Sequence, residues 1–120
     1  MDLNKFQSDL NSWLDHNFPN TNSDAQIKGV MEELGELCHY DLKWKQQIRG
    51  ITKENAIPKI KDAVGDIVIY LCNYCNTMNI SFRECVQTAM TEIMKRDWIE
   101  DPEGSEIKLR KRYHTESEVE

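Results

Sequence analysis

The stretch from Ile57 to Met78, IPKIKDAVGDIVIYLCNYCNTM, decides the fold that this sequence predicts. Its apolar residues recur at helical spacing and form one broad face, made up of Ile60, Val64, Ile67, Val68, Leu71, Cys72 and Cys75. The β-branched residues at 67–69 favour a strand locally, but the periodic pattern extends over more than about fifteen residues, which is longer than a typical strand. We therefore predict a helix over 57–78, with Pro58 in its first turn.

Three further segments carry helical patterns and span about 3–17, 25–48 and 81–98. The pattern over 25–48 follows a polar loop in which Ser23 or Asp24 is the predicted N-cap, and Gly50 marks its end. The pattern over 81–98 opens with Ser81 and Glu84, the spacing of a capping box. We expect the apolar face of 25–48 to be buried, namely Ile27, Val30, Met31, Leu34, Leu37 and Cys38. With no strand pattern, the sequence predicts an all-α four-helix bundle.

The chain has 120 residues, with 15 Lys and Arg against 21 Asp and Glu and a formal net charge of −6. This balance argues against nucleic acid as the main partner, because a phosphate backbone is bound by a basic face. No run of about 18 apolar residues is present, so we expect no transmembrane helix and no membrane partner. The amphipathic N-terminal segment is unlike a secretory signal, and we expect a cytoplasmic protein. Hydrophobic residues make up 39% of the chain, few enough that we expect part of the core at a subunit interface.

Four cysteines are present, and two of them, Cys72 and Cys75, have the C-x-x-C spacing of zinc sites and redox motifs. They lie inside an apolar run with no second C-x-x-C and no flanking Gly or Pro. We expect core-facing thiols that behave as small hydrophobic side chains, with a zinc site as the alternative.

Five carboxylates interrupt the apolar patterns of two helices: Glu32, Glu33, Glu36, Asp62 and Asp66. Those of each helix are three or four positions apart and so crowd one sector of it. No Lys or Arg lies between them to balance the charge, and burying such a cluster is costly unless a cation binds. Hard oxygen donors from two facing helices suit Mg²⁺ or Mn²⁺ rather than zinc.

The motif EELGE over 32–36, followed by DAVGDIVIYL over 62–71, resembles the MazG-like nucleoside triphosphate pyrophosphohydrolases. Their signature is E-E-x-x-E on one helix and E-x-x-D on the next. Further similar stretches extend the resemblance to about residues 3–100; these are Trp13, 17–19, 42–50 and 95–98. The resemblance implies a four-helix bundle of the MazG-like type over 1–100, assembling as a dimer or a dimer of dimers. Residues 101–120 lie outside this domain as a charged C-terminal tail.

The resemblance also assigns roles to the acids. It implies that Glu33 and Glu36 are metal ligands with Glu32 as the adjoining acid, and that Asp66 is the ligand of the second motif. Ala63 stands where the family has Glu, and Asp62 is the acid that supplies a ligand from one residue earlier. The cofactor is then Mg²⁺, with Mn²⁺ as an alternative metal.

The implied reaction is hydrolysis of a nucleoside or deoxynucleoside triphosphate to the monophosphate and pyrophosphate. Glu32 or Glu33 is the candidate general base. The candidate groups for substrate binding are Lys43, Arg49, Lys95 and Arg96 for the phosphates, Asn73 for phosphates or sugar, and Trp13 and His39, together with Phe18 and Trp44, for the base.

Two other functions stay open on the sequence. Glu36-x-x-His39 is half of a di-iron bundle motif, but the second Glu-x-x-His that such a site needs is missing. A non-catalytic helical binding module, whose acidic patch meets a basic protein surface, is the other alternative.

Overall fold

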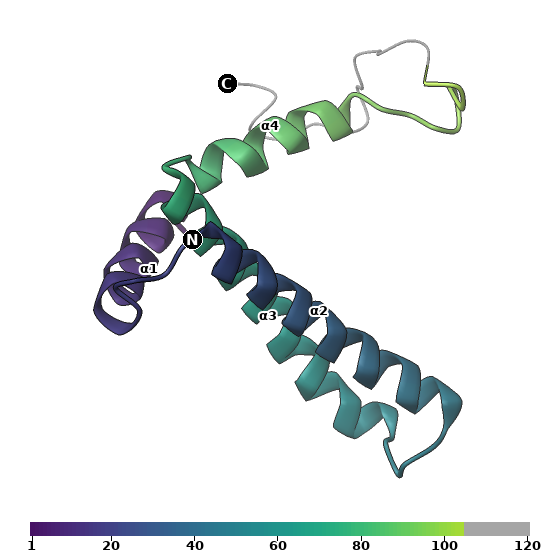
Figure 1. Ribbon diagram of the computed structural model, residues 1–120. Coiled ribbons are helices and arrows are strands. Elements are labelled where there is room, and N and C mark those ends of the chain that lie inside the picture. Colours follow the sequence, from purple (N-terminus) through teal and green to yellow (C-terminus); the bar gives the residue numbers. More distant parts are fainter. Residues whose placement is uncertain (105–120) are drawn as a thin grey trace. The chain divides into compact units, whose positions relative to one another are not determined.

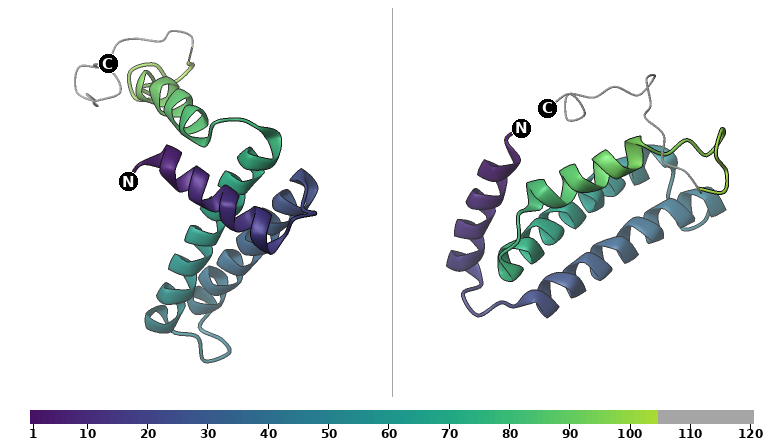
Figure 2. Two further views of the ribbon diagram at one scale, coloured as in Figure 1. Left: turned by 90° about the vertical axis from the view of Figure 1, so that its left-hand side faces the viewer. Right: turned by 90° about the horizontal axis from the view of Figure 1, so that it is seen from above.

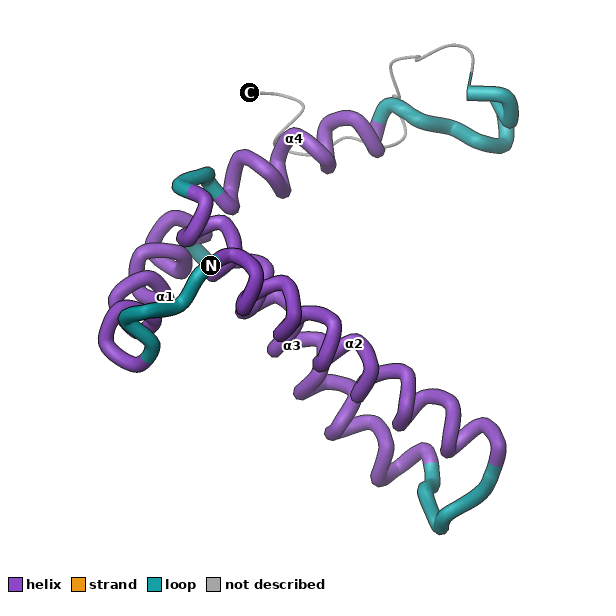
Figure 3. The backbone as a smooth tube through the Cα atoms, in the orientation of Figure 1, coloured by secondary structure: helices purple, strands orange, loops and turns teal. Residues whose placement is uncertain are grey.

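The computed structural model describes residues 1–104, and within that range it contains four α-helices and no β-strand. The helices are α1 (Leu3–Asn17), α2 (Ser23–Gln46), α3 (Lys53–Met78) and α4 (Phe82–Met94), shown in Figure 3. The all-α prediction is confirmed for this part of the chain. None of the described helices combines the length and the apolar character that crossing a bilayer requires.

The chain divides into two compact units, one from Met1 to Ile80 and one that begins at Ser81. In the first unit α2 and α3 lie side by side and antiparallel as a helical hairpin, and α1 packs against α3 (Figures 1 and 2). The second unit contains α4 and the segment that follows it as far as Gly104. The domain predicted over 1–100 spans both units, and most of the predicted tail lies outside the described residues.

Both ends of α2 differ from their prediction. Its N-cap is Asn22, whose side chain accepts a hydrogen bond at 2.9 Å from a backbone N–H three residues later, so Ser23 and Asp24 were the wrong choices. All three residue types are good N-caps, and residue type alone does not choose among them. The helix ends before Gly50 because Gln47 adopts a left-handed φ of 58° and serves as the C-cap.

The third helix begins at Lys53, earlier than predicted, because Thr52 and Asn55 form a reciprocal capping box. The Thr52 hydroxyl accepts the N–H of Asn55 at 3.3 Å, and the Asn55 side chain accepts the N–H of Thr52 at 2.7 Å. The prediction that Pro58 lies in the first turn is therefore wrong. Pro58 lies in the second turn, where it cannot donate to the carbonyl of Glu54.

The fourth helix has the predicted N-cap but ends early. The Ser81 hydroxyl accepts the N–H of Glu84 at 3.1 Å, whereas the helix stops at Met94 rather than at residue 98. The carboxylate of Asp97 accepts two backbone N–H groups of the residues that follow it, at 3.0 and 3.1 Å. This local hydrogen bonding forms a turn where the pattern predicted helix.

The buried apolar residues of the described chain are few, namely Leu14, Ala56, Ala63, Cys72 and Cys75. The prediction that Cys72 and Cys75 are core-facing thiols is confirmed, since both side chains are buried. Burial, together with the nearby Cys75, raises the pKa of Cys72 to about 11. A thiol that keeps its proton at neutral pH is a poor nucleophile and a poor metal ligand.

The prediction that the apolar face of α2 is buried is wrong for Ile27, Met31, Leu34 and Cys38, which are exposed. On the apolar face of α3, Val64, Val68 and Leu71 are exposed as well. The two helices meet instead along a neighbouring line, where Gln26 and Gly29 of α2 and Ala56 and Ala63 of α3 are buried. A Cβ atom built on Gly29 would overlap the ring of Tyr70. Small residues along this line therefore set how closely the helices approach.

Side-chain hydrogen bonds join α1 to the C-terminal part of α3. The side-chain amide of Asn76 donates to the carbonyl of Gln7 at 3.2 Å, and the side chain of Gln7 donates to the carbonyl of Ile80 at 2.9 Å. Asn76 also donates to the side-chain oxygen of the buried Asn73 at 3.2 Å. This end of α3 is both buried and hydrogen-bonded.

Candidate functional site

The five carboxylates that interrupt the apolar patterns lie on one side of the α2–α3 hairpin. Glu33 and Asp66 are half-buried where the helices meet, whereas Glu32, Glu36 and Asp62 are exposed. Glu33 interacts electrostatically with all four of the others, and Asp66 interacts with Asp62 and Glu36. The structure thus brings together acids from two helices, and we call them the acid cluster.

The carboxylates of the acid cluster repel one another, and this repulsion acts on the pKa values of two of them. Partial burial raises the pKa of Glu33, and the charges of Asp66, Glu36, Glu32 and Asp62 raise it further, in that order. Burial also raises the pKa of Asp66, followed by the charges of Asp62 and Glu36. No ion pair within residues 1–104 involves any of the five. Repulsion among carboxylates favours their protonated forms, or the binding of a cation.

The contact between Gly29 and Tyr70 sets the register that produces this cluster. Gly29 lies one helical turn before Glu33, and Tyr70 lies one turn after Asp66. Because the two helices are antiparallel, placing the Tyr70 ring over Gly29 brings Glu33 opposite Asp66. A glycine is required at position 29 because any side chain there would overlap the ring.

Tyr70 belongs to the surroundings of the acid cluster, and the sequence analysis missed it. Burial raises the pKa of Tyr70, and the charges of Glu32, Glu33 and Asp66 raise it further. Its hydroxyl therefore keeps its proton and stays a hydrogen-bond donor beside the carboxylates. The available signal was its spacing, since Tyr70 follows Asp66 by four positions and so shares its side of α3.

Ala63, at the position where the resemblance implies a Glu, lies in a packed part of α3. Ala63 is 1% exposed in the contact between α2 and α3, so a carboxylate at this position would enter the helix–helix contact. Asp62 is exposed, and its charge acts on both Glu33 and Asp66. Asp62 is thus the acid of this segment that belongs to the cluster.

Within residues 1–104, no three or more His, Cys, Asp or Glu side chains are already arranged to hold a metal ion. Repulsion between carboxylates without a counter-charge opposes such convergence. The chemistry of the donor set fits Mg²⁺ or Mn²⁺, because all five groups are carboxylates and these ions prefer oxygen ligands.

Two predicted substrate-binding residues lie in packing contacts of the first unit. Asn73 is buried, and its side-chain oxygen accepts a hydrogen bond from Asn76 in the network that joins α3 to α1. Trp13 is half-exposed, and its ring lies 5.8 Å from that of Phe18 at an interplanar angle of 59°. Their roles toward a substrate stay predictions.

Three other predicted residues lie farther along α2 and in the turn after it. His39 and Lys43 follow Glu36 by three and seven positions, so they share its side of the helix. The His39 ring meets the ring of Tyr40 edge-on at 5.1 Å, and the Lys43 ammonium donates to a side-chain oxygen at 3.2 Å. Arg49 is exposed and adopts a left-handed φ of 59°.

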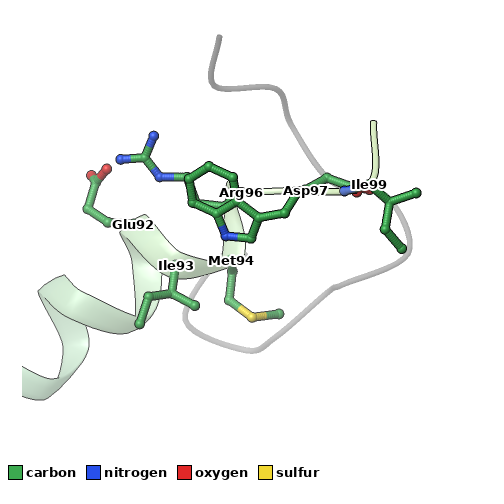
Figure 4. Close-up of a pocket in the computed structure, with 7 residues that line it drawn as sticks. Glu92, Ile93, Met94, Arg96, Asp97 and Ile99 are labelled. Atoms are coloured by element: carbon green, nitrogen blue, oxygen red, sulfur yellow. The ribbon is translucent and has the colours of Figure 1, made fainter. Parts of the chain in front are cut away.

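The remaining predicted cations, Lys95 and Arg96, belong to the second unit. Lys95 pairs with Glu92 at 3.4 Å. Arg96 lines a surface pocket of about 560 Å³ with apolar walls from Ile93, Met94 and Trp98 (Figure 4). Their predicted contact with substrate phosphates stays a prediction.

No protein-family model matches the chain, and neither the curated proteins nor the solved structures contain a match. The functional argument therefore depends on the motifs and on the acid cluster.

Proposed function

We propose that this protein is a MazG-like nucleoside triphosphate pyrophosphohydrolase, cytoplasmic and active as a homodimer or homotetramer. Its substrate is an NTP or dNTP, its products are the monophosphate and pyrophosphate, and its cofactor is Mg²⁺, with Mn²⁺ as an alternative. The observation that carries the proposal is the acid cluster, in which acids of E-E-x-x-E on α2 lie beside Asp66 on α3 and form no ion pair with a cation of residues 1–104.

The proposed metal ligands are Glu33, Glu36, Asp62 and Asp66. When bound, Mg²⁺ supplies positive charge to the triphosphate oxygens and polarises water. The carboxylates themselves select for a cation, because their mutual repulsion is relieved only by protonation or by a positive ion. A protein with a net charge of −6 can in this way take a substrate that is itself strongly negative.

The chemical step needs a proton acceptor near the α-phosphorus. Water attacks that phosphorus, the bond to the oxygen bridging the α and β phosphates breaks, and pyrophosphate leaves. The proton of the water passes to a carboxylate oxygen of Glu32 or Glu33. The raised pKa of Glu33 makes its carboxylate a stronger base than an ordinary glutamate near neutral pH.

The substrate-binding residues belong to the same proposal. Lys43, Arg49, Lys95 and Arg96 bind phosphates, and Asn73 binds phosphates or sugar. Trp13 and His39 contact the base. His39 and Lys43 have the most direct support, since they lie on the side of α2 that carries Glu36.

The decisive experiment assays a panel of NTPs and dNTPs with Mg²⁺ and with Mn²⁺ for release of pyrophosphate rather than single phosphates. Glu36→Gln and Asp66→Asn are each expected to abolish turnover while the helical circular dichroism stays intact. Asp9→Asn, which changes an exposed acid of α1, is the matched control and keeps activity. Full activity in Glu36→Gln or Asp66→Asn contradicts the assignment of the site.

Two results would favour the alternatives. Pyrophosphate release from none of the nucleotides favours the non-catalytic binding module. An absorption band on loading with iron favours the di-iron bundle.

A further inference from the structure

A polar pocket lies where α1, the loop before α2 and the last turn of α3 come together. Its volume is about 380 Å³, and residues of all three segments line it. Every one of these residues belongs to the first unit. The volume lies within the range of sites that bind small molecules.

The pocket shares the side of α3 that carries the acid cluster. Thr77, which lines the pocket, follows Asp66 by eleven positions. Eleven residues make about three helical turns and about 16 Å of helix, so Thr77 and Asp66 lie on one side of α3 at that separation. A nucleotide carries its base and its phosphates at opposite ends. The pocket is therefore positioned for the base of a nucleotide whose phosphates lie at the acid cluster.

The groups that α3 offers to this pocket are hydrogen-bond acceptors. The side-chain nitrogen of Asn76 donates to the carbonyl of Gln7 at 3.2 Å and to the side-chain oxygen of Asn73 at 3.2 Å. Both of its hydrogens are thereby used, and only the side-chain oxygen of Asn76 is left for a ligand. The hydroxyl of Thr77 donates to the carbonyl of Tyr74 at 2.7 Å, so toward a ligand its oxygen can only accept.

A carboxylate of α1 adds to these acceptors. Asp15 lines the pocket and is exposed, and no ion pair within residues 1–104 involves it. An ionised carboxylate accepts hydrogen bonds and donates none. Leu14 and Pro19 supply apolar lining against which a flat ring can pack, and within residues 1–104 no Lys or Arg lines the pocket. The pocket therefore suits a neutral ring that carries N–H groups, and does not suit a phosphate.

One group of the lining is free to donate. The side-chain oxygen of Asn22 accepts the backbone N–H of Ala25 at 2.9 Å, which leaves the Asn22 side-chain nitrogen as a donor. Several acceptors and a donor match the Watson–Crick edge of guanine, where N1–H and the 2-amino group lie beside a carbonyl oxygen. Uracil and thymine have a single N–H between two carbonyl oxygens and would leave acceptors of the pocket unpaired.

We infer that this pocket, lined by Asp15, Asn22, Asn76 and Thr77, binds the base of the substrate and selects guanine over uracil and thymine. The inference deepens the proposed function by naming GTP and dGTP as the preferred substrates. The selection comes from the unpaired acceptors that a wrong base leaves in the site, which cost more than a missing contact.

This assignment also gives the substrate a direction along the hairpin. The helix α2 begins at the pocket with Ser23, and Lys43 lies near its other end. With the base in the pocket, the triphosphate extends past the acid cluster toward Lys43, a proposed phosphate-binding residue. Of the two residues proposed to contact the base, Trp13 lies on the helix that carries Asp15, whereas His39 lies beyond the acid cluster. The inference therefore favours Trp13.

Titration of the ¹⁵N-labelled full chain with nucleosides, followed by nuclear magnetic resonance in metal-free buffer, tests the inference. Guanosine, inosine and uridine carry no phosphate, and inosine differs from guanosine only in lacking the 2-amino group. Guanosine is expected to shift the resonances of Asn22, Asn76 and Thr77. Inosine is expected to bind about tenfold more weakly, because one acceptor stays unpaired, and uridine more weakly still.

A pair of variants on α1 tests the role of the carboxylate. Asp15→Asn is expected to weaken guanosine binding by about tenfold, because hydrogen bonds to a charged acceptor are the stronger ones. Asp9→Asn is the matched control, since it removes the same charge from an exposed acid of the same helix that does not line the pocket. It keeps the wild-type affinity. Circular dichroism checks that both variants keep their helices.

The outcomes separate this inference from the proposed function, because the titration uses neither a metal nor hydrolysis. Pocket resonances that none of the three nucleosides shifts overturn the inference. Equal affinities for guanosine and uridine overturn it as well, as does an Asp15→Asn variant that binds guanosine like the wild type. Selective guanosine binding by a chain that releases no pyrophosphate would support the inference and contradict the proposed function. Pyrophosphate release without a preference for guanine would do the reverse.

Discussion

Two stretches of α3 contrast with each other, although one continuous helix carries both. Around Cys72 and Asn73 the side chains are buried and hydrogen-bonded to one another and to α1. Around Asp62 and Asp66 the side chains are charged and unbalanced, and the pKa of Asp66 is raised. The polar groups of the first stretch have hydrogen-bond partners within the protein. The second stretch carries like charges, whose repulsion is relieved only by protonation or by a bound cation. Carboxylates with perturbed pKa values cluster at functional sites.

The largest expected effect comes from Ala63→Glu, which extends the charged stretch into the packed contact. A carboxylate in this buried position without a partner is expected to cost about 3 kcal/mol or more of the free energy of unfolding. Urea denaturation followed by circular dichroism in metal-free buffer measures it. Asp62→Glu, which changes the exposed neighbour, is the control with a small effect. An unchanged unfolding midpoint in Ala63→Glu would contradict the packing described for α2 and α3.

The second prediction concerns the cation. Mg²⁺ at about a hundred times its dissociation constant is expected to stabilise the wild-type protein by about 2.7 kcal/mol, because it binds the folded state alone. Thermal unfolding with and without Mg²⁺, at matched ionic strength, measures this gain. Asp66→Asn is expected to lose most of it. Equal gains in both proteins would place the bound ion elsewhere.

The third prediction addresses the buried stretch. Asn73→Ala is expected to cost about 1–2 kcal/mol, because it removes a buried side-chain oxygen and leaves the half-buried Asn76 amide with one partner fewer. The loss should be the same with and without Mg²⁺, unlike that of Asp66→Asn. A double-mutant cycle with Asn76→Ala should show that the two losses are not additive. Additive losses would mean that the Asn73–Asn76 hydrogen bond contributes nothing to stability.

The smallest expected effect is the pH dependence of the metal-free protein. Folding raises the pKa of Glu33 above 4.5 and that of Asp66 above 3.8, so these groups stabilise the fold fully below those ordinary values. Their contribution is lost as the pH rises through the raised values. Stability set by these two groups should therefore increase modestly as the pH falls through the raised pKa values toward the ordinary ones. Comparing the free energy of unfolding of wild type and Asp66→Asn over this pH range isolates the contribution of Asp66. Identical pH profiles of the two proteins would contradict the raised pKa of Asp66.

The sequence predicted the all-α fold and the buried thiols because both follow from local pattern. Helical periodicity identified the four helices of residues 1–104, and the apolar run around Cys72 and Cys75 indicated burial. The ends of the helices were less predictable. The choice of Asn22 over Ser23, and the early start at Thr52, depend on which of several competent side chains reaches a free N–H.

Which apolar residues are buried could not be read from periodicity. A helix with apolar residues over a wide arc leaves open which part of the arc meets its neighbour. In this protein, the part of the arc that is buried depends on the contact between the Tyr70 ring and Gly29, two residues far apart in the sequence. That same contact brings Glu33 opposite Asp66. The motifs predicted which acids belong to the site. That these acids lie close together depends on how α2 and α3 pack.

The turn over 47–52, where Gln47, Arg49 and Gly50 all adopt left-handed φ values, has a kinetic consequence. It joins the two acid-bearing helices by a short connection, so closing the hairpin costs little chain entropy. Closing the hairpin brings the carboxylates of the two helices together, and their repulsion opposes this step. A divalent cation should accordingly accelerate refolding as well as slow unfolding.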